Sequence, residues 1–525
     1  MPSLSPMARR LWPLLLVLAA IAAGAGFWWL RRVDPAQTAP LLVVGIDGAE
    51  WRVVRYMWRQ GELPNLRRLA DRGSTAWLRT AYNASPVIWT TIATGVTPAE
   101  HGITDFVVPS PHGDVPVTST LRRVPALWTM LTQVHRHVSV FGWWGSWPAE
   151  DVDGVVVTDR ALFDLDDRVS PPAYLPKLAQ DLEWARTRPY FAAREEPELR
   201  DAVMAAAARR MVREDPDLLL LYFRSSDIVS HHHWKEFEAV ETGARPHADS
   251  PVQRIYRAID AAIGEVMAAA RGPLNVLVIS DHGFRAARKQ EVLTLSNLDA
   301  LLVRLGYQRR DAKGVDLARS QLYSYGSPTY QRKKLVRCCL AGREPGGTLT
   351  DSQCDAVRAR FEADLGRVTF AGGEPVFLVR DARPPEERAG ADFVALLSSV
   401  GTSTAVRIDK QPVADVVTEV SELSGTHDSS NNGILIAAGP NFAAGVNLDG
   451  ISVLDMTPTV LYGRGLPVAE NFAGRAWTEL YRPEFRDRHP LRTIRAWGGA
   501  RQTTARNSKA DDKLIQELRS LGYLR

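Results

Sequence analysis

The sequence predicts an α/β fold in which a mostly parallel sheet lies between helices. Three short apolar runs, each of a length typical of a buried strand, end near an aspartate: Leu41–Ile46 before Asp47, Asp217–Phe223 before Asp227, and Leu274–Ile279 before Asp281. Amphipathic stretches with helical spacing, such as 65–72 and 252–270, lie between these runs. Strands that alternate with helices form mostly parallel sheets, and such sheets bind ligands at the carboxyl ends of their strands. The pattern therefore predicts both the fold and the place of a site.

The bulk composition is that of a globular protein. The 525 residues are 45% hydrophobic and 24% charged, which excludes a disordered or fibrous chain. This length suffices for two or three domains, or for one large domain with insertions. The net charge of +4 is small and gives no nucleic-acid-binding signature. The sequence does not indicate an oligomeric state.

The first 33 residues contain a candidate membrane segment. The apolar run Leu11–Leu30 is long enough to span a bilayer as a helix, and arginines flank it on both sides. The alternative is a cleaved signal peptide, with Ala-Gly-Ala at 23–25 as the cleavage site. We favour an uncleaved transmembrane anchor, because cleavage would leave an exposed Phe-Trp-Trp-Leu cluster at the new N-terminus. We expect the remainder of the chain to be exported, in the periplasm or outside the cell.

Changes in composition and pattern divide the rest of the chain, which a short linker at 33–40 joins to the N-terminal segment. We expect a catalytic core built from three separate segments, interrupted by a helical insertion and by a subdomain, and followed by a basic tail with a short helix. In order, these are the first core segment at 41–160, the helical insertion at 161–214, the second core segment at 215–285, the subdomain at 286–424, the third core segment at 425–475 and the tail at 476–525.

The cysteines are confined to the predicted subdomain. Cys338 and Cys339 are adjacent, and Cys354 follows shortly after them. In an oxidising compartment Cys354 can form a disulfide with either member of the pair, while the odd count excludes a complete disulfide framework.

One candidate metal-binding group centres on the segment after the second apolar run. Asp227 and His231 are four residues apart, so on a helix they project from one face and can bind one ion together. His427, in the segment SGTHD, can complete a set of three ligands. Nitrogen and oxygen donors of this kind suit zinc, with manganese and iron as alternatives. The neighbouring His232 and His233 would point away from this face.

A second candidate group combines the ends of the other two runs. Asp281 and His282 are adjacent where the backbone turns after its strand, and with Asp47 they can bind a second ion. Two divalent cations about 3.5–4 Å apart can stabilise both the attacking and the leaving oxygen of a displacement at phosphorus. The sequence therefore predicts a two-metal site.

The segment at 85–95 (SPVIWTTIATG) supplies candidate nucleophiles: Ser85, Thr90, Thr91 and Thr94. Thr91 and Thr94 fall within a predicted helix, where hydroxyls commonly bond to the preceding turn. Ser85 precedes a proline, which favours a position at the junction of loop and helix. There the N-terminus of the helix would stabilise a bound phosphate. We therefore predict Ser85 as the nucleophile.

The segments GIDG, SPVIWTTIATGVTPAEHGI, DIVSH, SDHG and GTHD together resemble the alkaline phosphatase superfamily, and within it the type I phosphodiesterase/nucleotide pyrophosphatase family. WWGSWPAE at 143–150 is similar to a group of exported bacterial members. The resemblance implies an alkaline-phosphatase-like core. It also implies roles for the residues already singled out: one zinc ion bound by Asp227, His231 and His427, the other bound by Asp47, Asp281 and His282, and Ser85 in the place of the family's Thr or Ser nucleophile. His101 matches a family residue without an implied ligand role.

One departure from the family pattern bears on the substrate. The nucleotide pyrophosphatases carry an asparagine shortly after the HGI motif that helps to hold the phosphoryl oxygen, and Phe106 stands there in this chain. The resemblance therefore implies the metals and the nucleophile without implying a nucleotide substrate.

We expect a two-zinc hydrolase of phosphate esters, with phosphodiesters favoured, that acts through a phosphoserine intermediate. A membrane-proximal phosphoryl or phosphoalcohol transferase acting on lipid or glycan is an alternative. A sulfatase-like hydrolase is disfavoured, because SPVIW lacks the arginine that sulfatases carry after their nucleophile. A binding protein with a decayed site is disfavoured by the complete ligand set.

Overall fold

A computed structural model describes residues 39–108, 115–188, 197–247, 250–287, 292–311, 314–324, 333–382, 391–398, 405–422, 424–427, 430, 432–498 and 503–520. The predicted membrane anchor at Leu11–Leu30 lies outside these residues. Within them, no helix combines the length and the apolar character needed to cross a bilayer.

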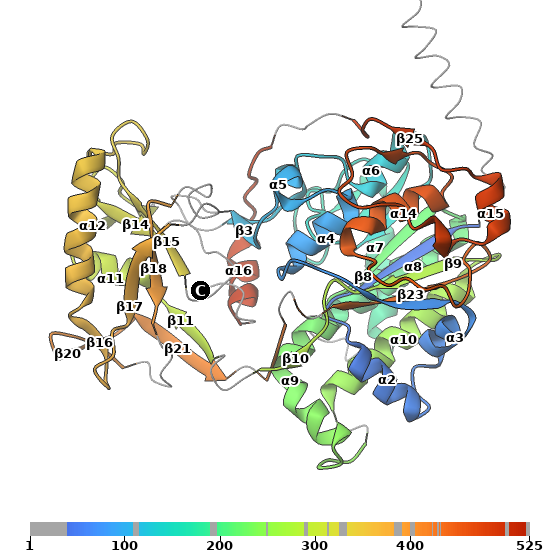
Figure 1. Cartoon of the computed structure of the whole chain (residues 1–525), viewed down its shortest axis with the longest axis horizontal. Helices are drawn as coiled ribbons and strands as arrows, with labels where there is room; N and C mark the ends of the chain where they lie inside the picture. The colour runs from blue at the N-terminus through green and yellow to red at the C-terminus, as the bar shows by residue number, and fades with distance from the viewer. Residues whose placement is uncertain are drawn as a thin grey trace, which may run out of the picture.

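An eight-stranded sheet forms the centre of the larger lobe (Figure 1). Its strands lie in the order β2 (Ser74–Leu78), β23 (Gly433–Ala438), β9 (Asn275–Ile279), β1 (Leu41–Ile46), β8 (Leu218–Phe223), β5 (Val138–Phe141), β6 (Gly154–Val157) and β7 (Val169–Ser170). The strands from β9 to β6 are parallel. On one side β23 runs antiparallel to β9 and β2 antiparallel to β23, and on the other β7 runs antiparallel to β6. The sheet is therefore mixed, and the predicted parallel arrangement applies to its central strands.

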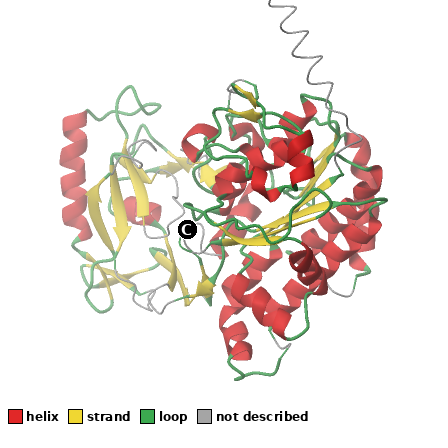
Figure 2. Cartoon of the chain, turned by 45° about the vertical axis from the view of Figure 1, so that its right-hand side comes forward, coloured by secondary structure: helices red, strands yellow, loops and turns green. Residues whose placement is uncertain are grey.

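Helices cover both faces of this sheet, as Figure 2 shows. Alternate residues of β1 point to opposite faces: Leu42, Val44 and Ile46 belong to one buried cluster, and Leu41 and Val43 to the other. The first face packs against α2 (Trp51–Arg59), α3 (Pro64–Arg72), α7 (Leu175–Arg186), α8 (Glu198–Met211), α9 (Ser225–Glu241) and α10 (Pro251–Ala269). The second packs against α4 (Ser85–Thr94), α6 (Leu127–Thr132) and α14 (Met456–Gly463), with the short α5 (Pro98–His101) beside α4. Burial on both faces explains why the central strands are continuous apolar runs.

The predicted helical insertion at 161–214 is packed into this core. It contains β7, α7 and α8, and α8 contacts β5 and β8. Its Ala202–Ala208 stretch is buried in the same cluster as the sheet. Small side chains there allow α8 to approach the strands closely, so this helix belongs to the layer that packs directly on the sheet.

The predicted subdomain at 286–424 forms a second lobe, seen at the left of Figure 1, with its own buried cluster. A four-stranded antiparallel sheet contains β14 (Leu322–Ser324), β15 (Lys333–Cys338), β18 (Phe393–Leu397) and β17 (Phe377–Asp381). Its other elements are β12 (Arg310–Asp311), β13 (Gly314–Val315), β16 (Val368–Phe370), β19 (Val406–Ile408), β20 (Gln411–Val413), α11 (Leu298–Arg304) and α12 (Asp351–Leu365). Two antiparallel strand pairs connect the lobes: β10 (Arg285–Ala286) with β22 (Gly425–Thr426), and β11 (Val292–Ser296) with β21 (Val417–Glu422).

A disulfide in the second lobe joins Cys338, at the end of β15, to Cys354 in α12. Cys339 is a buried free thiol. Of the two pairings that the sequence allows, the structure therefore contains the one between Cys338 and Cys354.

The C-terminal region of the chain returns to the larger lobe. Its elements are β24 (Val468–Ala469), which pairs with β25 (Thr493–Ile494), then α15 (Pro483–Arg488) and α16 (Asp511–Ser520). The short pair of β3 (Val107–Val108) and β4 (Val115–Pro116) lies close to α16 (Figure 1). Single 3₁₀ turns occur at Ser119–Leu121, Pro172–Tyr174, Val212–Glu214, Val453–Asp455 and Thr478–Leu480.

Candidate metal centre

The carboxyl ends of three central strands bring the predicted ligands together. Asp47 directly follows β1, Asp227 and His231 lie in the first turns of α9 after β8, and Asp281 and His282 directly follow β9. His427 follows β22, shortly before β23. Because β23 is antiparallel to β9, it begins at the edge of the sheet where β9 ends, and this delivers His427 to the same place.

The first group consists of Asp227, His231 and His427, all buried, with candidate ligand atoms within 4.8 Å of one another. Oδ1 of Asp227 lies 3.5 Å from Nε2 of His231 and 3.8 Å from Nε2 of His427. The spacing of Asp227 and His231 on one helical face, which the sequence predicts, is what directs both toward His427.

The second group consists of Asp47, Asp281 and His282, also buried and within the same limit of 4.8 Å. Nε2 of His282 lies 3.4 Å from Oδ1 of Asp47 and 3.3 Å from Oδ2 of Asp281. The amide of Gly48 donates to Oδ1 of Asp281 at 3.1 Å, which leaves Oδ2 directed at the group. Gly48 has a φ of 65°, a left-handed conformation that glycine adopts without strain.

The two groups adjoin through their imidazoles. The rings of His282 and His427 are stacked, with centroids 3.6 Å apart and an interplanar angle of 11°. Nε2 of His282 is also 4.0 Å from Oδ1 of Asp227. The two sets of ligands therefore form one continuous site.

Hydrogen bonds fix the orientation of two of the imidazoles. Nδ1 of His231 lies 3.1 Å from the carbonyl oxygen of Gly425, and Nδ1 of His282 lies 3.1 Å from that of Gly283. Because a carbonyl oxygen only accepts, each Nδ1 carries a proton, and each Nε2 faces the carboxylates. Metal-binding histidines are typically held in this way.

The charges of the site favour bound cations. Burial, together with the charge of Asp227, raises the pKa of Asp47, and burial together with Asp47 raises the pKa of Asp281. Burial would raise the pKa of Asp227 as well, but the imidazoles of His231, His427 and His282 together outweigh it, and the pKa of Asp227 is lowered.

A further atom of the site also fits a cation. Oδ2 of Asp281 is buried without a hydrogen-bond donor among the described residues. Buried carboxylates require a compensating positive charge. A donor set of imidazole nitrogens and carboxylate oxygens in two adjoining groups therefore fits two divalent cations.

Ser85 lies against the second group, at the first residue of α4. Its hydroxyl donates to Oδ1 of Asp47 at 3.2 Å and is 3.4 Å from Nε2 of His282. The hydroxyls of Thr91 and Thr94 donate to carbonyl oxygens one turn earlier in the helix, at 2.8 and 2.7 Å. Of these hydroxyls, the one of Ser85 is directed at the candidate metal ligands.

Other histidines of the sequence motifs lie apart from the ligand groups. His232 is exposed, and Nδ1 of His233 pairs with Glu236 at 2.7 Å. His101 is buried, its Nε2 lies 3.0 Å from the hydroxyl of Thr91, and its Nδ1 accepts from the amide of Ile103 at 3.1 Å. This histidine joins the loop after α5 to α4.

Two contacts to Asp47 are absent from the sequence-based prediction. The hydroxyl of Tyr222 and Nε1 of Trp144 both donate to Oδ2 of Asp47, the latter at 3.4 Å. Tyr222 belongs to an apolar strand and Trp144 to the motif WWGSWPAE. Both are aromatic side chains that carry a hydrogen-bond donor and stand near the end of a strand, and this feature of the sequence could have indicated the contacts. Phe106, in the place of the family's asparagine, is buried and packs edge-on against Trp144.

The sequence of this chain matches one known protein family. The model of the type I phosphodiesterase/nucleotide pyrophosphatase family matches residues 41–387. No curated protein matches the chain in sequence.

Among solved structures, human ectonucleotide pyrophosphatase/phosphodiesterase 5 is 14% identical, with 84% of this chain and 99% of that chain covered and a TM-score of 0.48. The inactive murine protein in complex with AMP is 15% identical, with 85% and 100% covered and a TM-score of 0.48. Phosphonoacetate hydrolase from Sinorhizobium meliloti 1021 in complex with phosphonoformate is 17% identical, with 81% and 96% covered and a TM-score of 0.47.

Proposed function

Because the chain belongs to the type I phosphodiesterase/nucleotide pyrophosphatase family, a family of metal-dependent hydrolases of phosphate esters, we propose that it is a two-zinc phosphodiesterase with Ser85 as its nucleophile. The observation that carries the proposal is the position of the Ser85 hydroxyl, 3.2 Å from Oδ1 of Asp47 and at the edge of two adjoining groups of metal-ligand type. The remaining steps follow from what these side chains can do.

Two ions would be held by the two groups: Asp227 with His231 and His427, and Asp47 with Asp281 and His282. When bound, divalent cations lower the pKa of a nearby hydroxyl and neutralise charge on the phosphoryl oxygens. Zinc suits a mixture of imidazole and carboxylate donors. Elemental analysis of the purified protein tests this assignment, with about two zinc ions per chain as the expected result.

The reaction proceeds in two displacements. Ser85 Oγ loses its proton, forms a bond to phosphorus, and the bond from phosphorus to the leaving alcohol breaks as that alcohol takes up a proton. Water then attacks phosphorus, and the bond from phosphorus to Ser85 Oγ breaks as the serine regains its proton. The side chains contribute position and charge: the hydroxyl already points at a carboxylate, and the N-terminus of α4 favours an anion beside it.

The surroundings of Ser85 support a diester over a monoester. Beyond the ligand groups, Ala84 and Val87 on either side of the serine pack in an apolar cluster with Phe106. A phosphodiester carries one negative charge at its phosphorus and an organic group on each side, whereas a monoester carries up to two charges. Apolar walls favour the species with less charge and more organic surface.

The experiment compares hydrolysis of bis-p-nitrophenyl phosphate, p-nitrophenyl phosphate and p-nitrophenyl sulfate by the zinc- and manganese-loaded protein. We expect the diester to give the highest kcat/KM, and Ser85→Ala to lower it by about 10³-fold or more. Ser139→Ala, at a buried serine of β5, is the matched control and should retain activity. If the metal-loaded protein hydrolyses neither phosphate, the proposed hydrolase function is refuted. If Ser85→Ala retains activity, the assignment of Ser85 as the nucleophile is refuted.

We also propose that the catalytic region is exported and held at the membrane by residues 11–30. The disulfide between Cys338 and Cys354 supports this, because such bonds persist in oxidising compartments. In cells that express the full chain, protease added outside the plasma membrane should digest the protein. Protection of the intact chain in this assay would contradict the proposal.

A further inference from the structure

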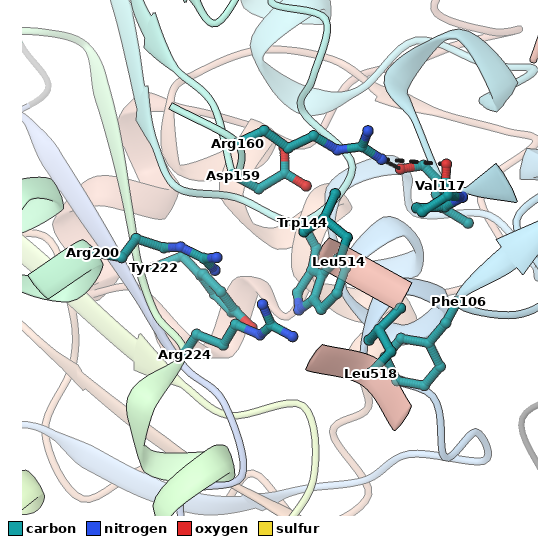
Figure 3. A pocket seen from close by; sticks show the side chains of 11 residues that line it. Phe106, Val117, Trp144, Asp159, Arg160, Arg200, Tyr222, Arg224, Leu514 and Leu518 are labelled. Atoms are coloured by element: carbon teal, nitrogen blue, oxygen red, sulfur yellow. Dashed lines mark hydrogen bonds between the residues drawn. The ribbon is translucent and has the colours of Figure 1, made fainter. Parts of the chain in front are cut away.

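Buried arginines line a small cavity beside the candidate metal centre (Figure 3). Arg160, Arg200 and Arg224 are each only 3–4% exposed. A guanidinium stays charged at all accessible pH values, so its burial requires anionic or carbonyl partners. Three such groups around one cavity, next to a site that acts on anions, therefore call for an explanation.

Two aromatic side chains, Trp144 and Tyr222, lie between this cavity and Asp47 of the candidate metal centre. Nε1 of Trp144 donates to Oδ2 of Asp47 at 3.4 Å, and the guanidinium carbon of Arg224 lies 4.9 Å from the centre of the Trp144 ring. Tyr222, which also donates to Asp47, lines the same cavity. The Trp144 ring thus contacts both Arg224 and the candidate metal ligand Asp47.

The C-terminal helix α16 closes this cavity. Its Leu514 and Leu518 line the cavity wall, as Figure 3 shows. Leu518 packs in the same apolar cluster as Ala84 and Val87, the residues that flank Ser85. The helix therefore packs against the residues that flank the proposed nucleophile as well as lining the cavity of the arginines.

Carboxylates of α16 meet two of the three arginines. Glu517 pairs with Arg224 at 2.8 Å, and Asp511 pairs with Arg160 at 3.1 Å. Arg160 also donates to the carbonyl oxygen of Val117 at 2.9 Å, so it is held by the core as well as by the helix. Arg224 and Arg200 both lower the pKa of Glu517, against the effect of its burial. The Glu517 carboxylate thus pairs with Arg224 and is also stabilised by the charge of Arg200.

The geometry points to a second substrate site, and we propose that Arg224 and Arg200 bind an anionic group on the portion of the phosphodiester that is not released first. In the absence of substrate, Glu517 of α16 occupies this place. The ligand is a carboxylate or phosphate oxyanion, because a guanidinium fork matches the planar pair of oxygens that both present. The proposal rests on the proposed phosphodiesterase function and adds the substrate class to it.

The competing explanation is that Glu517 merely anchors α16 to the core. The two explanations differ in substrate selectivity. An anchor stabilises the helix and leaves the choice between anionic and neutral substrates unchanged, whereas an occupant of a substrate site competes with anionic substrates alone.

The experiment uses p-nitrophenyl aryl phosphodiesters that differ only in the second ring, which is phenyl, carboxyphenyl or phosphonophenyl. The measured quantity is the ratio of kcat/KM between each anionic diester and the phenyl diester, in the full-length metal-loaded protein. We expect the wild-type ratio to exceed one. Arg224→Gln should lower it by about 10- to 100-fold, the value of a charge-assisted hydrogen bond. Glu517→Gln should raise it by about 3- to 10-fold, because the competing carboxylate is removed.

Two further variants serve as controls. Asp512→Asn removes one negative charge from the exposed face of the same helix and should leave the ratio as in the wild type. The double variant Arg224→Gln/Glu517→Gln leaves neither partner buried without the other, so it should fold even where Arg224→Gln alone does not, and its ratio should be low. A ratio that is the same in all variants would overturn the subsite while leaving the hydrolase intact.

A second readout does not depend on turnover. Hydrogen exchange of the backbone amides of Asp511–Ser520 is followed while the protein is saturated with carboxyphenyl phosphate or with phenyl phosphate. If the anionic ring displaces Glu517, carboxyphenyl phosphate alone should accelerate exchange in α16, by about tenfold, and Arg224→Gln should abolish this difference. Equal exchange with both compounds would refute the subsite even in a protein that hydrolyses none of the diesters.

Discussion

His101 lies near the candidate site, and its surroundings hold its side chain in the neutral form. Burial, reinforced by the positive charges of Arg122 and Arg123, lowers its pKa to about 3. Its Nδ1 accepts from the amide of Ile103 and so carries no proton. A neutral ring in this place ties the loop after α5 to the helix that begins at Ser85, because its Nε2 lies 3.0 Å from the hydroxyl of Thr91.

This lowered pKa predicts how stability depends on pH. The pKa is about 3 in the folded protein and about 6.5 in the unfolded chain. Between these values the unfolded chain binds a proton that the folded protein does not, so stability falls as the pH decreases from 6.5 towards 3. We expect the difference in the free energy of unfolding between pH 7.5 and pH 5 to be about 2 kcal/mol smaller in His101→Asn than in the wild type.

Urea unfolding at the two pH values measures this difference. Ile103→Val, a buried neighbour without a titrating group, is the control and should lower stability equally at both. An unchanged pH dependence in His101→Asn would contradict a buried neutral histidine.

At the residue scale, the sequence predicts the candidate metal ligands that the structure brings together, and it misses the side chains that contact them. Asp227 and His231 are recognisable because their spacing has a geometric meaning on a helix. Tyr222 contacts Asp47 only because β1 and β8 are neighbours and because its side chain points to the face where Asp47 lies. That contact depends on the order of strands in the sheet, which local sequence patterns do not contain.

At the scale of elements, the short strand β22 determines where His427 lies. Gly425 in this strand packs against α9, and a Cβ atom there would lie 2.5 Å from the carbonyl oxygen of Ser230 and 2.7 Å from Cβ of Trp234. The carbonyl oxygen of Gly425 also accepts the Nδ1 proton of His231. One glycine thus sets the distance between two of the ligands of the first group.

Gly425→Ala should therefore weaken metal binding more than it weakens the fold. The added methyl group must push β22 away from α9, which displaces His427 and lengthens the bond that orients His231. We expect the metal affinity of the first group, Asp227 with His231 and His427, to fall by about 10- to 100-fold, as for other changes that disturb the support of a metal ligand. Competition with a chelating dye measures the affinity, and Gly272→Ala, where nothing lies within 4 Å of the new methyl group, should bind zinc as the wild type does. Wild-type zinc affinity in Gly425→Ala would show that this packing does not set the ligand geometry.

The elements themselves are predicted unevenly by the sequence. The central strands are evident, because burial on both faces requires the apolar runs at 41–46 and 218–223. The antiparallel direction of β23 is not, because GILIAA reads equally well in either direction. The segment at 161–214 is predicted as a helical insertion, and the structure places its helix α8 directly on the sheet, where its side chains are small.

At the scale of the whole molecule, two lobes have separate stabilising features. The larger lobe contains the buried carboxylates Asp47, Asp227 and Asp281, whose mutual repulsion bound cations would relieve. The smaller lobe has its own buried cluster and the disulfide between Cys338 and Cys354. Among the described residues, two short antiparallel strand pairs lie where the chain passes from one lobe to the other.

We therefore expect two thermal transitions that respond to different treatments. Removal of metal by a chelator should lower the midpoint of the larger lobe alone, because the loss of tightly bound ligand removes several kcal/mol of stabilisation. Reduction should lower the midpoint of the smaller lobe alone, by the equivalent of about 3 kcal/mol for a loop of this length. Differential scanning calorimetry measures both midpoints.

Two variants serve as controls. Cys354→Ala should abolish the response to reductant, and Cys339→Ala should retain it, since Cys339 forms no disulfide. A single transition that shifts under both treatments would contradict independent lobes.

The position of the smaller lobe in the sequence also determines the order in which the candidate ligands are synthesised. The chain leaves the larger lobe after His282 and returns to it just before His427. A polypeptide emerges from the ribosome with its N-terminus first, so the ligands of one proposed zinc ion are all present by residue 282, whereas the other ion waits until the whole intervening lobe has been synthesised. On this assignment the side chains of the second group are complete before the smaller lobe has been made, and those of the first group only after it.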